Sequence, residues 1–430
     1  MRAKSLPMHA LQRVDKRLGP IACALLQPLR WTRPLLRRRQ SRVEKVLLIK
    51  FWGVGSLQLL TPSVVHLRAK YPHAELVLLT LAVNHSAAEG FGSFDRVLSF
   101  DVGRSGWLGL AARVASLVAS LRRERFDAVF DFEFFTRFSA LVSLLTGARE
   151  SHGFASTSVW RGNFHTHIAP FNRYWHVARN FRSLAGGEDG AQISARDLLP
   201  HQIGAMDAAR VDGMLEAYGI DARDGFAVLN PNAGELNFER RWPQPSFAAL
   251  AQRLAREDRL PVILIGSRGE REYTQAVVDK ALDQHLPRPV NLAGDLSTGE
   301  LASLLSRCAV FVTNDSGPMH LAAALGTPTV GLFGPETPLL YGPVGSRVRA
   351  LYRPPACSPC INVHDNKVAS CIWGFPQCLV ALEVSEVHAA AQAFLRGDDL
   401  TMFTLEPVAR PAQRNVHPSR TSARANEAGG

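Results

Sequence analysis

A polar loop between two apolar runs is the most constraining feature of this chain. It lies within residues 312–335, VTNDSGPMHLAAALGTPTVGLFGP. The runs at 309–312 (AVFV) and 329–333 (TVGLF) predict two parallel, buried strands. Asp315 or Ser316 can cap a helix between them, and the proline that follows suits a first turn. In an open α/β sheet, such a loop lies at the carboxyl edge of the strands, where ligands bind.

The same loop has the chemistry of a phosphate site. Free N–H groups and the positive end of a helix dipole attract phosphate, and His320 in the first turn can add a donor. Asp315 would repel a phosphate, so we expect it to cap the helix or to accept hydrogen bonds from sugar hydroxyls. A well-capped turn that binds nothing is the alternative, because good caps are common.

The length of 430 residues predicts two α/β domains with tails rather than one core. Apolar strands alternate with helical segments in both halves, which is typical of doubly wound parallel sheets. The expected division is a basic arm (1–43), an N-terminal Rossmann-like domain (44–205), a C-terminal Rossmann-like domain (206–385), a helical region (386–403) and a disordered tail (404–430). Two such halves leave a cleft between them.

The net charge of +11 is concentrated at the ends of the chain. Residues 1–43 hold eleven Lys and Arg against a single Asp, and residues 404–430 hold four Arg against two Glu. The body is therefore close to neutral, which argues against nucleic acid as a partner. The arm mixes arginines with Leu and Trp, as an interfacial segment for anionic lipid does; a disordered tail and a misassigned start codon are the alternatives. No run reaches the roughly 18 apolar residues of a membrane span, and no cleaved signal peptide is expected.

Basic residues mark two further candidate binding regions. Arg240 and Arg241 lie on the loop after the first strand of the second half, and the fixed guanidinium fork suits a diphosphate. In the first half, Arg149 and His176 belong to a basic, histidine-bearing stretch, and Arg137 precedes it. These three are the candidate acceptor-binding residues, although a solvated surface would look the same.

Four cysteines near the C-terminus form the pattern C-x2-C-x10-C-x6-C. They are Cys357, Cys360, Cys371 and Cys378. Such a set can hold a structural zinc ion, but the second CxxC of a typical zinc site is missing. Reduced, packed cysteines are the alternative.

The segment NDSGPMHLAAALGTPTVGLFGP at 314–335 resembles the signature of the bacterial heptosyltransferases, glycosyltransferase family 9. LLIKFWGVGSLQLLTP at 47–62, RRWP at 240–243 and the CSPC segment extend the resemblance over roughly 45–395. It implies a GT-B architecture, in which two Rossmann-like domains face a central cleft and a final helix, here 384–395, crosses back to the first domain. The implied reaction is inverting transfer of heptose from ADP-heptose to a lipopolysaccharide core, without a catalytic metal.

The resemblance also assigns roles to residues. It implies that the donor is bound by Arg240, Arg241, Asn314, Asp315, Ser316, Gly317 and His320. The family loop usually reads S-L-G-D, and its Asp is the proposed general base; here residues 53–56 read GVGS, so Ser56 takes that position. A serine hydroxyl is too weak a base to act unaided. Asp131 and Glu133 are the candidate substitutes; otherwise the acceptor differs or the activity is lost.

The implied partners are a nucleotide-sugar donor and a lipid-linked or glycan acceptor, and no cofactor is required. The implied location is cytoplasmic, peripheral on the inner membrane. Two alternatives stay open. One is a GT-B enzyme that uses another sugar nucleotide, an epimerase included, and the other is a non-catalytic nucleotide-sugar-binding protein, which Ser56 favours.

Overall fold

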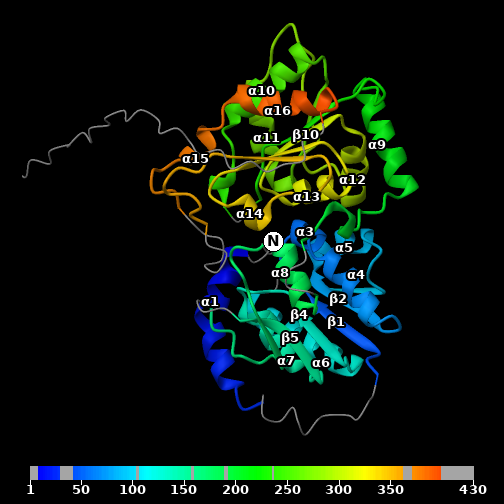
Figure 1. Ribbon diagram of the computed structural model, residues 1–430, viewed down its shortest axis with the longest axis vertical. Coiled ribbons are helices and arrows are strands. Elements are labelled where there is room, and N and C mark those ends of the chain that lie inside the picture. Colours follow the sequence, from blue (N-terminus) through cyan, green and yellow to red (C-terminus); the bar gives the residue numbers. More distant parts are fainter. Residues whose placement is uncertain are drawn as a thin grey trace, which may run out of the picture.

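The computed structural model describes residues 8–29, 42–102, 106–155, 159–187, 192–234, 237–361 and 370–398. They form two α/β domains, one above the other in Figure 1, each built on a six-stranded parallel sheet. The predicted architecture is therefore confirmed. The C-terminal tail and residues 30–41 of the basic arm lie outside the described residues.

The first sheet has the strand order β3-β2-β1-β4-β5-β6. Its strands are β1 (Lys45–Ile49), β2 (Glu75–Leu81), β3 (Arg96–Phe100), β4 (Ala128–Asp131), β5 (Glu150–Ala155) and β6 (His167–Pro170). The helices around it are α1 (Met8–Leu25), α3 (Val54–Gln58), α4 (Thr61–Lys70), η2 (Ala82–Asn84), α5 (His85–Gly90), α6 (Gly106–Glu124), α7 (Arg137–Leu145), α8 (Val177–Leu184) and η3 (Ala195–Asp197).

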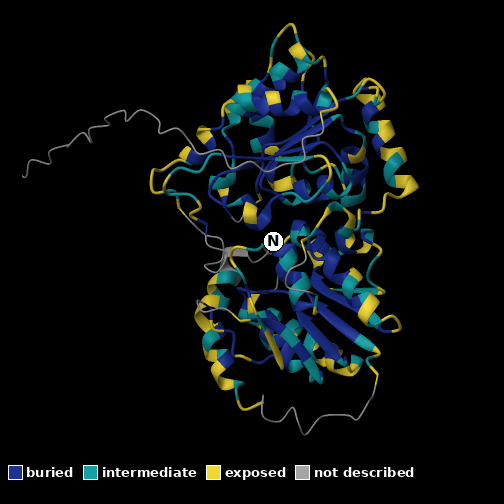
Figure 2. Cartoon of the chain, in the orientation of Figure 1, coloured by how far each residue is buried: buried dark blue, intermediate teal, exposed yellow. Residues whose placement is uncertain are grey.

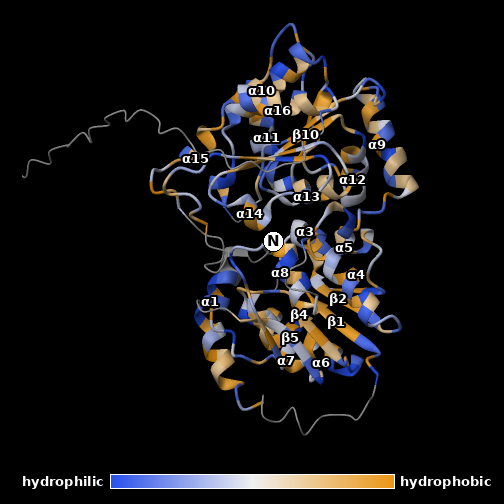
Figure 3. Cartoon of the chain, viewed as in Figure 1, coloured by the Kyte–Doolittle hydropathy of each residue, from blue (hydrophilic) through white to orange (hydrophobic). Residues whose placement is uncertain are grey.

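Strand β1 shows why its sequence is apolar throughout. Successive side chains of a strand point to opposite faces, and both faces of this sheet are covered. Val46 and Leu48 are buried in one cluster with residues of α4 and α8. Leu47 and Ile49 are buried in another with residues of α6 and α7. Figure 3 shows the same strands as the most apolar part of the domain.

The second sheet has the order β12-β11-β10-β7-β8-β9. Its strands are β7 (Ala227–Asn230), β8 (Val262–Leu264), β9 (Val290–Asn291), β10 (Val310–Asn314), β11 (Thr329–Phe333) and β12 (Val348–Tyr352). The helices are α9 (Ala205–Ala217), η4 (Phe238–Arg240), α10 (Gln244–Glu257), η5 (Arg268–Glu270), α11 (Arg271–Lys280), α12 (Thr298–Arg307), α13 (Gly317–Ala324), α14 (Pro338–Tyr341), α15 (Gln377–Val380) and α16 (Val384–Leu395).

The last helix, α16, stays on the second domain. Val387 and Phe394 pack into the cluster formed by β7, β10 and α10, next to the indole of Trp242. That indole donates to the carbonyl oxygen of Leu382 at 3.0 Å, which holds the chain entering α16. The expectation that residues 384–395 cross back to the first domain is therefore wrong. An apolar face that fits α10 fixes the helix on its own domain.

Helix α1 is an ordered part of the first domain rather than a free arm. Asp15 accepts hydrogen bonds from the backbone N–H groups of Arg137 and Phe138, each at 2.9 Å. These N–H groups begin α7, so a carboxylate from another helix caps α7 and meets the positive end of its dipole. Cys23 packs beside Ala140 in the same contact. Among the described residues, no helix is both long enough and apolar enough to cross a membrane.

Candidate functional site

A cavity of about 480 Å³ lies where the carboxyl edges of the two sheets face each other. The first domain contributes Lys50 and the glycine loop 52–56, and the second contributes the loops after β7, β8 and β10. Figure 1 shows α3 and α13 meeting at this junction, and Figure 2 shows it as a largely buried region. The sequence-predicted ligand loop is thus on the cavity.

The second domain holds the loop before α13 rigidly. The Asn230 side-chain amide donates to the hydroxyls of Thr313 and Ser316, both at 3.1 Å. One terminal nitrogen of Arg240 donates to the backbone oxygen and to the carboxylate of Asp315, each at 3.1 Å. Both side chains are largely buried, so the pair fixes the guanidinium at the wall of the cavity.

Five of the seven predicted donor-binding residues line the cavity. They are Arg240, Asp315, Ser316, Gly317 and His320. These residues surround the N-terminus of α13, where backbone N–H groups have no partner within the helix. The arrangement therefore suits an anionic group.

The other two predicted donor residues, Asn314 and Arg241, do not line the cavity. Asn314 accepts from the backbone N–H of Trp242 at 2.9 Å and joins β10 to the RRWP segment. The Arg241 guanidinium lies 4.5 Å from the ring centroid of Phe238 and 4.2 Å from that of Tyr273. Arg241 also pairs with Glu270 at 3.2 Å. Both residues therefore take supporting positions behind the cavity.

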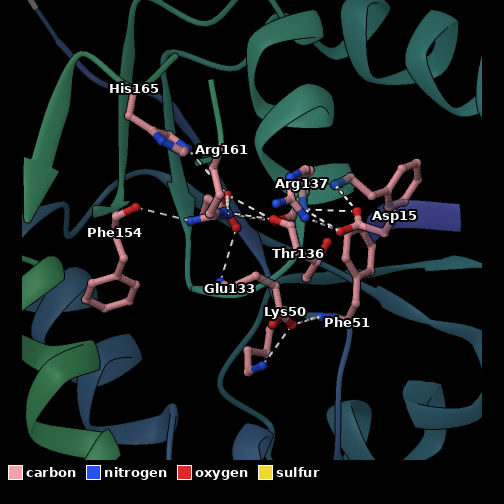
Figure 4. Close-up of polar contacts among 12 residues, drawn as sticks. Asp15, Lys50, Phe51, Glu133, Thr136, Arg137, Phe154, Arg161 and His165 are labelled. Atoms are coloured by element: carbon pink, nitrogen blue, oxygen red, sulfur yellow. Dashed lines mark hydrogen bonds and ion pairs between the residues drawn. The ribbon is translucent and has the colours of Figure 1, made fainter. Parts of the chain in front are cut away.

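On the first domain, Glu133 organises the start of the glycine loop. One carboxylate oxygen accepts from the Lys50 ammonium at 2.8 Å and from the N–H groups of Phe51 and Trp52 at 2.8 and 3.0 Å (Figure 4). Lys50 is only 1% exposed and Glu133 is fully buried. Glu133 itself does not line the cavity, whereas Lys50 does. The candidate base Glu133 therefore lies behind the residues that line the cavity. It holds the start of the loop through the Lys50 ammonium and the N–H groups of Phe51 and Trp52.

Asp131 lies still deeper. It is fully buried, forms an ion pair with Arg161, and accepts from the Ser139 hydroxyl at 3.1 Å (Figure 4). Its second ionic partner, His165, lies 3.3 Å away. Burial alone would raise the pKa of Asp131, but Arg161 and His165 together hold that pKa below its usual range. A buried carboxylate that favours its charged, paired state does not reach a substrate in the cleft, so the structure does not support Asp131 as the substitute base.

The three predicted acceptor-binding residues are not on the cavity. Arg149 precedes β5 and pairs with Glu150 at 2.8 Å, at the amino edge of the sheet and away from the cleft. Arg137 belongs to the contact between α1 and α7, and its Nε donates to the carbonyl oxygen of Trp160 at 3.0 Å. His176 instead joins the two domains: its Nδ1 accepts from the N–H of Ala178, so Nε2 donates to the carbonyl oxygen of Gly342 at 3.0 Å.

The contact of His176 predicts a pH effect on stability. Burial lowers the pKa of His176 to about 4, whereas an unfolded histidine titrates near 6.5. Below about pH 6.5 the unfolded chain binds the proton more readily, so this contribution to stability is lost as the pH falls from about 6.5 towards 4. The protein should lose unfolding free energy between pH 7.5 and 5.5, and His176→Gln should reduce that loss by on the order of 1 kcal/mol because it removes the titrating imidazole. The partial exposure of the side chain keeps the effect at this size. Urea unfolding at the two pH values measures it; identical pH dependence in both proteins would contradict the assignment.

The glycine loop touches the donor loop directly, and that contact depends on Gly55. A Cβ added to Gly55 would lie 2.7 Å from Cδ2 of His320 and 2.9 Å from Cα of Gly317. Any side chain there must push the two domains apart. Gly55 therefore allows the close approach of the two loops.

We therefore expect Gly55→Ala to lower kcat about a hundredfold, as a displacement of about 1 Å in a site can do. Gly213→Ala in α9 is the matched control, because a Cβ there meets nothing within 4 Å. Steady-state rates and the Tm of both variants measure the effect. A normal rate in Gly55→Ala would show that the contact does not set the site geometry.

The structural zinc site at the cysteine segment stays a prediction. Among the described residues, no three His, Cys, Asp or Glu side chains are grouped so that they could hold a metal ion. Cys378 is buried, and burial raises the pKa of its thiol to about 12, which disfavours the thiolate that binds zinc. Residues 362–369 of this segment lie outside the described residues.

Lys50 and Glu270 line the cavity and are charged, but they were not among the predicted site residues. Lys50 ends the apolar run VLLIK, and a charged residue at the carboxyl end of a buried strand was the available signal. Glu270 accepts from Ser267 in a capping box and from the backbone N–H of Gly234 at 3.2 Å. The sequence SRGE carries the S-x-x-E pattern of that box.

Comparisons with known proteins identify the family of the chain. Residues 114–369, more than half of the chain, match the family model "Glycosyltransferase family 9 (heptosyltransferase)". The chain is 25% identical over 316 residues to lipopolysaccharide heptosyltransferase 2 of Escherichia coli K12, covering 71% of this chain and 87% of that protein. It is 36% identical over 114 residues to lipooligosaccharide heptosyltransferase 2 of Haemophilus influenzae, covering 26% and 32%.

Two solved structures share the fold. The E. coli ADP-heptose LPS heptosyltransferase II superposes with a TM-score of 0.64 at 22% identity, covering 82% of this chain and 99% of that one. A family 9 glycosyltransferase from Veillonella parvula superposes with a TM-score of 0.67 at 21% identity, covering 83% and 98%. Together with the family-model match, the two facing sheets and the loop before α13 show that this chain belongs to glycosyltransferase family 9, the heptosyltransferase family.

Proposed function

We propose that this chain transfers heptose from ADP-heptose to a lipopolysaccharide core or a related glycan, with inversion at the anomeric carbon. The observation that carries the proposal is the cavity in which the N-terminus of α13 and Arg240 face the glycine loop across the two domains. The names of the relatives supply the sugar and the acceptor class. The structure supplies an anion site on one wall and a second binding wall opposite.

In this proposal the diphosphate of the donor lies against the first turn of α13. The N–H groups there and the Arg240 guanidinium donate to phosphate oxygens, and Gly317 has no side chain to obstruct them. His320 lies in the same turn. Asp315 keeps Arg240 in position, and its carboxylate edge is available to sugar hydroxyls.

The chemical step is a displacement at the anomeric carbon. An acceptor oxygen forms the new bond, the bond from that carbon to the diphosphate breaks, and the electron pair leaves with the nucleoside diphosphate. The dipole of α13 and Arg240 stabilise the charge that develops on the leaving group. The proton of the acceptor hydroxyl must pass to a base, and no catalytic metal enters the proposal. Transfer that is unchanged by a chelating agent tests this last point.

The base is the incomplete part of this site. Among the described residues that line the cavity, the carboxylates are Glu270 and Asp315, both from the second domain. Ser56 lines the cavity where the family resemblance implies a base. The first domain thus presents the Ser56 hydroxyl on this wall, and the Lys50 ammonium is paired with the buried Glu133.

We expect Ser56→Asp to increase kcat by a factor of about 10² to 10⁴, the usual contribution of a general base. Ser56→Asn is the matched control, because Asn has the size of Asp but no charge; its kcat should not increase. Single-turnover rates with saturating donor measure the chemical step. If Ser56→Asp is no faster than the unmodified enzyme, the rate is not limited by a missing base at this position.

The function itself is tested with the full chain, ADP-heptose and a panel of core glycan acceptors. Product mass and release of ADP report transfer, and ADP-, UDP- and GDP-sugars in a thermal-shift series report the donor. A donor at about 100 times its Kd adds roughly 2.7 kcal/mol of stability. Stabilisation by UDP- or GDP-sugars alone would overturn the choice of ADP-heptose.

A non-catalytic nucleotide-sugar-binding protein is the second candidate. The observation that favours it is the absence of a carboxylate from the first-domain wall of the cavity among the described lining residues. Donor binding without transfer to any acceptor, and without epimerisation, would support it.

We also propose that the chain acts at the cytoplasmic face of an anionic membrane, without binding nucleic acid. Lys16 and Arg17 on α1 are exposed, which suits contact with anionic headgroups. Sedimentation with phosphatidylglycerol vesicles at low and high salt tests this contact.

A further inference from the structure

An apolar groove lies between α1 and α6 in the first domain. Its volume is about 800 Å³, within the range of about 300–1,000 Å³ typical of small-molecule sites. It is lined almost entirely by carbon, and it lies in the domain that also forms the acceptor wall. We call it the α1–α6 groove.

Helix α6 has two apolar stripes, and the fold uses only one of them. Leu110, Val114, Leu117 and Leu121 pack against the sheet, and Leu110 and Val114, at the edge of this stripe, also line the groove. Trp107, Ala111, Ala115, Val118 and Ala119 recur at helical spacing and line the groove instead. Trp107 is 50% exposed, although tryptophan side chains are on average highly buried in folded proteins.

Helix α1 forms the facing wall. Val14, Leu18 and Ala22, each four residues apart, line the groove, and Leu18 is 58% exposed. The Asp15 cap on α7 fixes α1 in this place, so the groove is built by specific contacts. Figure 2 shows exposed residues along α1, and Figure 3 shows apolar ones toward its C-terminal end.

The groove borders the transfer cleft. Trp52 and Phe135 line both the groove and the cavity between the domains. Trp52 directly precedes the glycine loop that carries Ser56. A chain held in the groove therefore lies next to the wall where the acceptor must be held, with Trp52 and Phe135 between the two sites.

The borders of the groove are basic. Arg122 lines its far end, and Arg123 beside it is exposed. Lys16 and Arg17 are exposed on α1. Apolar walls with basic borders match an anionic amphiphile, whose chains avoid water while its charged groups meet cations.

We propose that the α1–α6 groove binds an acyl chain of the acceptor glycolipid and so presents the glycan head to the transfer cleft. This inference rests on the proposed function, because that function makes the acceptor lipid-linked. The groove would give the enzyme a preference for acylated acceptors over the same glycan without its chains.

The test fills the groove with a side chain. Ala115→Trp projects an indole into it, and Ala119→Trp, one turn further on, is the second variant. Ala112→Trp is the matched control, because Ala112 is exposed on the same helix but does not line the groove. All three leave the packed stripe of α6 intact, and Tm values check that each variant folds.

The binding measurement is independent of transfer and uses the fluorescent fatty acid cis-parinaric acid. We expect the unmodified protein and Ala112→Trp to bind it, and Ala115→Trp and Ala119→Trp to bind it about tenfold more weakly or less, a change equivalent to 1.4 kcal/mol. The acylated core glycolipid should displace it, and the deacylated glycan should not. Equal binding by all variants, or no binding by the unmodified protein, would overturn the proposal.

The transfer measurement compares the acylated and deacylated acceptors. Ala115→Trp should raise KM for the acylated acceptor about tenfold and leave kcat/KM for the deacylated one unchanged. Displacement of the probe by phosphatidylglycerol, or by a peptide of residues 30–41, as readily as by the glycolipid would assign the groove to a membrane lipid or to the chain itself. Probe binding without transfer to any acceptor would overturn the proposed function but not the groove as an acyl site.

Discussion

Arg240→Ala should reduce transfer by a factor of about 10² to 10³ while the protein stays folded, the usual cost of removing one donor that stabilises developing charge. Arg240 lines the cavity beside the N-terminus of α13, and Asp315 holds it there through two hydrogen bonds of 3.1 Å. The substitution removes a fixed positive charge from the leaving-group side of the site. Steady-state kinetics with saturating acceptor measure kcat, and a Tm within a few degrees of the unmodified protein shows that the fold persists.

Two further variants sharpen this result. Arg240→Lys keeps the charge but loses the planar fork, so it should recover part of the rate. Asp315→Ala removes the carboxylate that pairs with the guanidinium and leaves only the backbone acceptors of residues 315 and 233, so it should also abolish efficient transfer. Normal rates in both Arg240→Ala and Asp315→Ala would remove the pair from the active site.

Asp131→Ala should cost about 3–5 kcal/mol of folding free energy, because it leaves a buried guanidinium without its counter-charge. Arg161 and Asp131 are 3% and 0% exposed, and the same carboxylate also meets Ser139 and His165. Urea unfolding measures the change. The matched control is Asp295→Ala, which breaks the exposed pair with Arg271 at 2.7 Å and should cost at most about 1 kcal/mol.

This experiment also separates a structural role from a catalytic one. A destabilised Asp131→Ala protein that still transfers sugar at low temperature fits the ion pair described above. A variant with unchanged stability and no activity would instead restore Asp131 as the substitute base.

The sequence predicted well what neighbouring residues determine. The apolar runs of β1 and β10 predict buried parallel strands, and the NDSGP loop predicts a helix start at the carboxyl edge. Ser316 takes the N-cap position, but the predicted side-chain cap is wrong, because neither Ser316 nor Asp315 makes a cap hydrogen bond and both bind other side chains instead. These features depend on local spacing and on the rule that parallel sheets are covered on both faces. The donor wall of the cavity follows from them.

The acceptor side could not be predicted in the same way. Arg149 belongs to a basic stretch, but β5 begins directly after it, so the residue lies at the edge of the sheet away from the cleft. The partner of Asp131 is Arg161, thirty residues later on the connection between β5 and β6. The path of the chain between β5 and β6 determines that Arg161 pairs with Asp131. The spacing of the residues in the sequence does not predict that path.

The cap that Asp15 places on α7 changes how the basic N-terminal region should be regarded. By charge it is an appendage, and it precedes the residues that match the family model. By its contacts it is part of the first domain, since the N-terminal N–H groups of α7 donate hydrogen bonds to its Asp15. A chain trimmed to the shared family core would begin after α1 and would leave two N–H groups of α7 without this carboxylate. Substitutions at Asp15 are therefore constrained by the fold itself, in a segment that family membership alone would treat as dispensable.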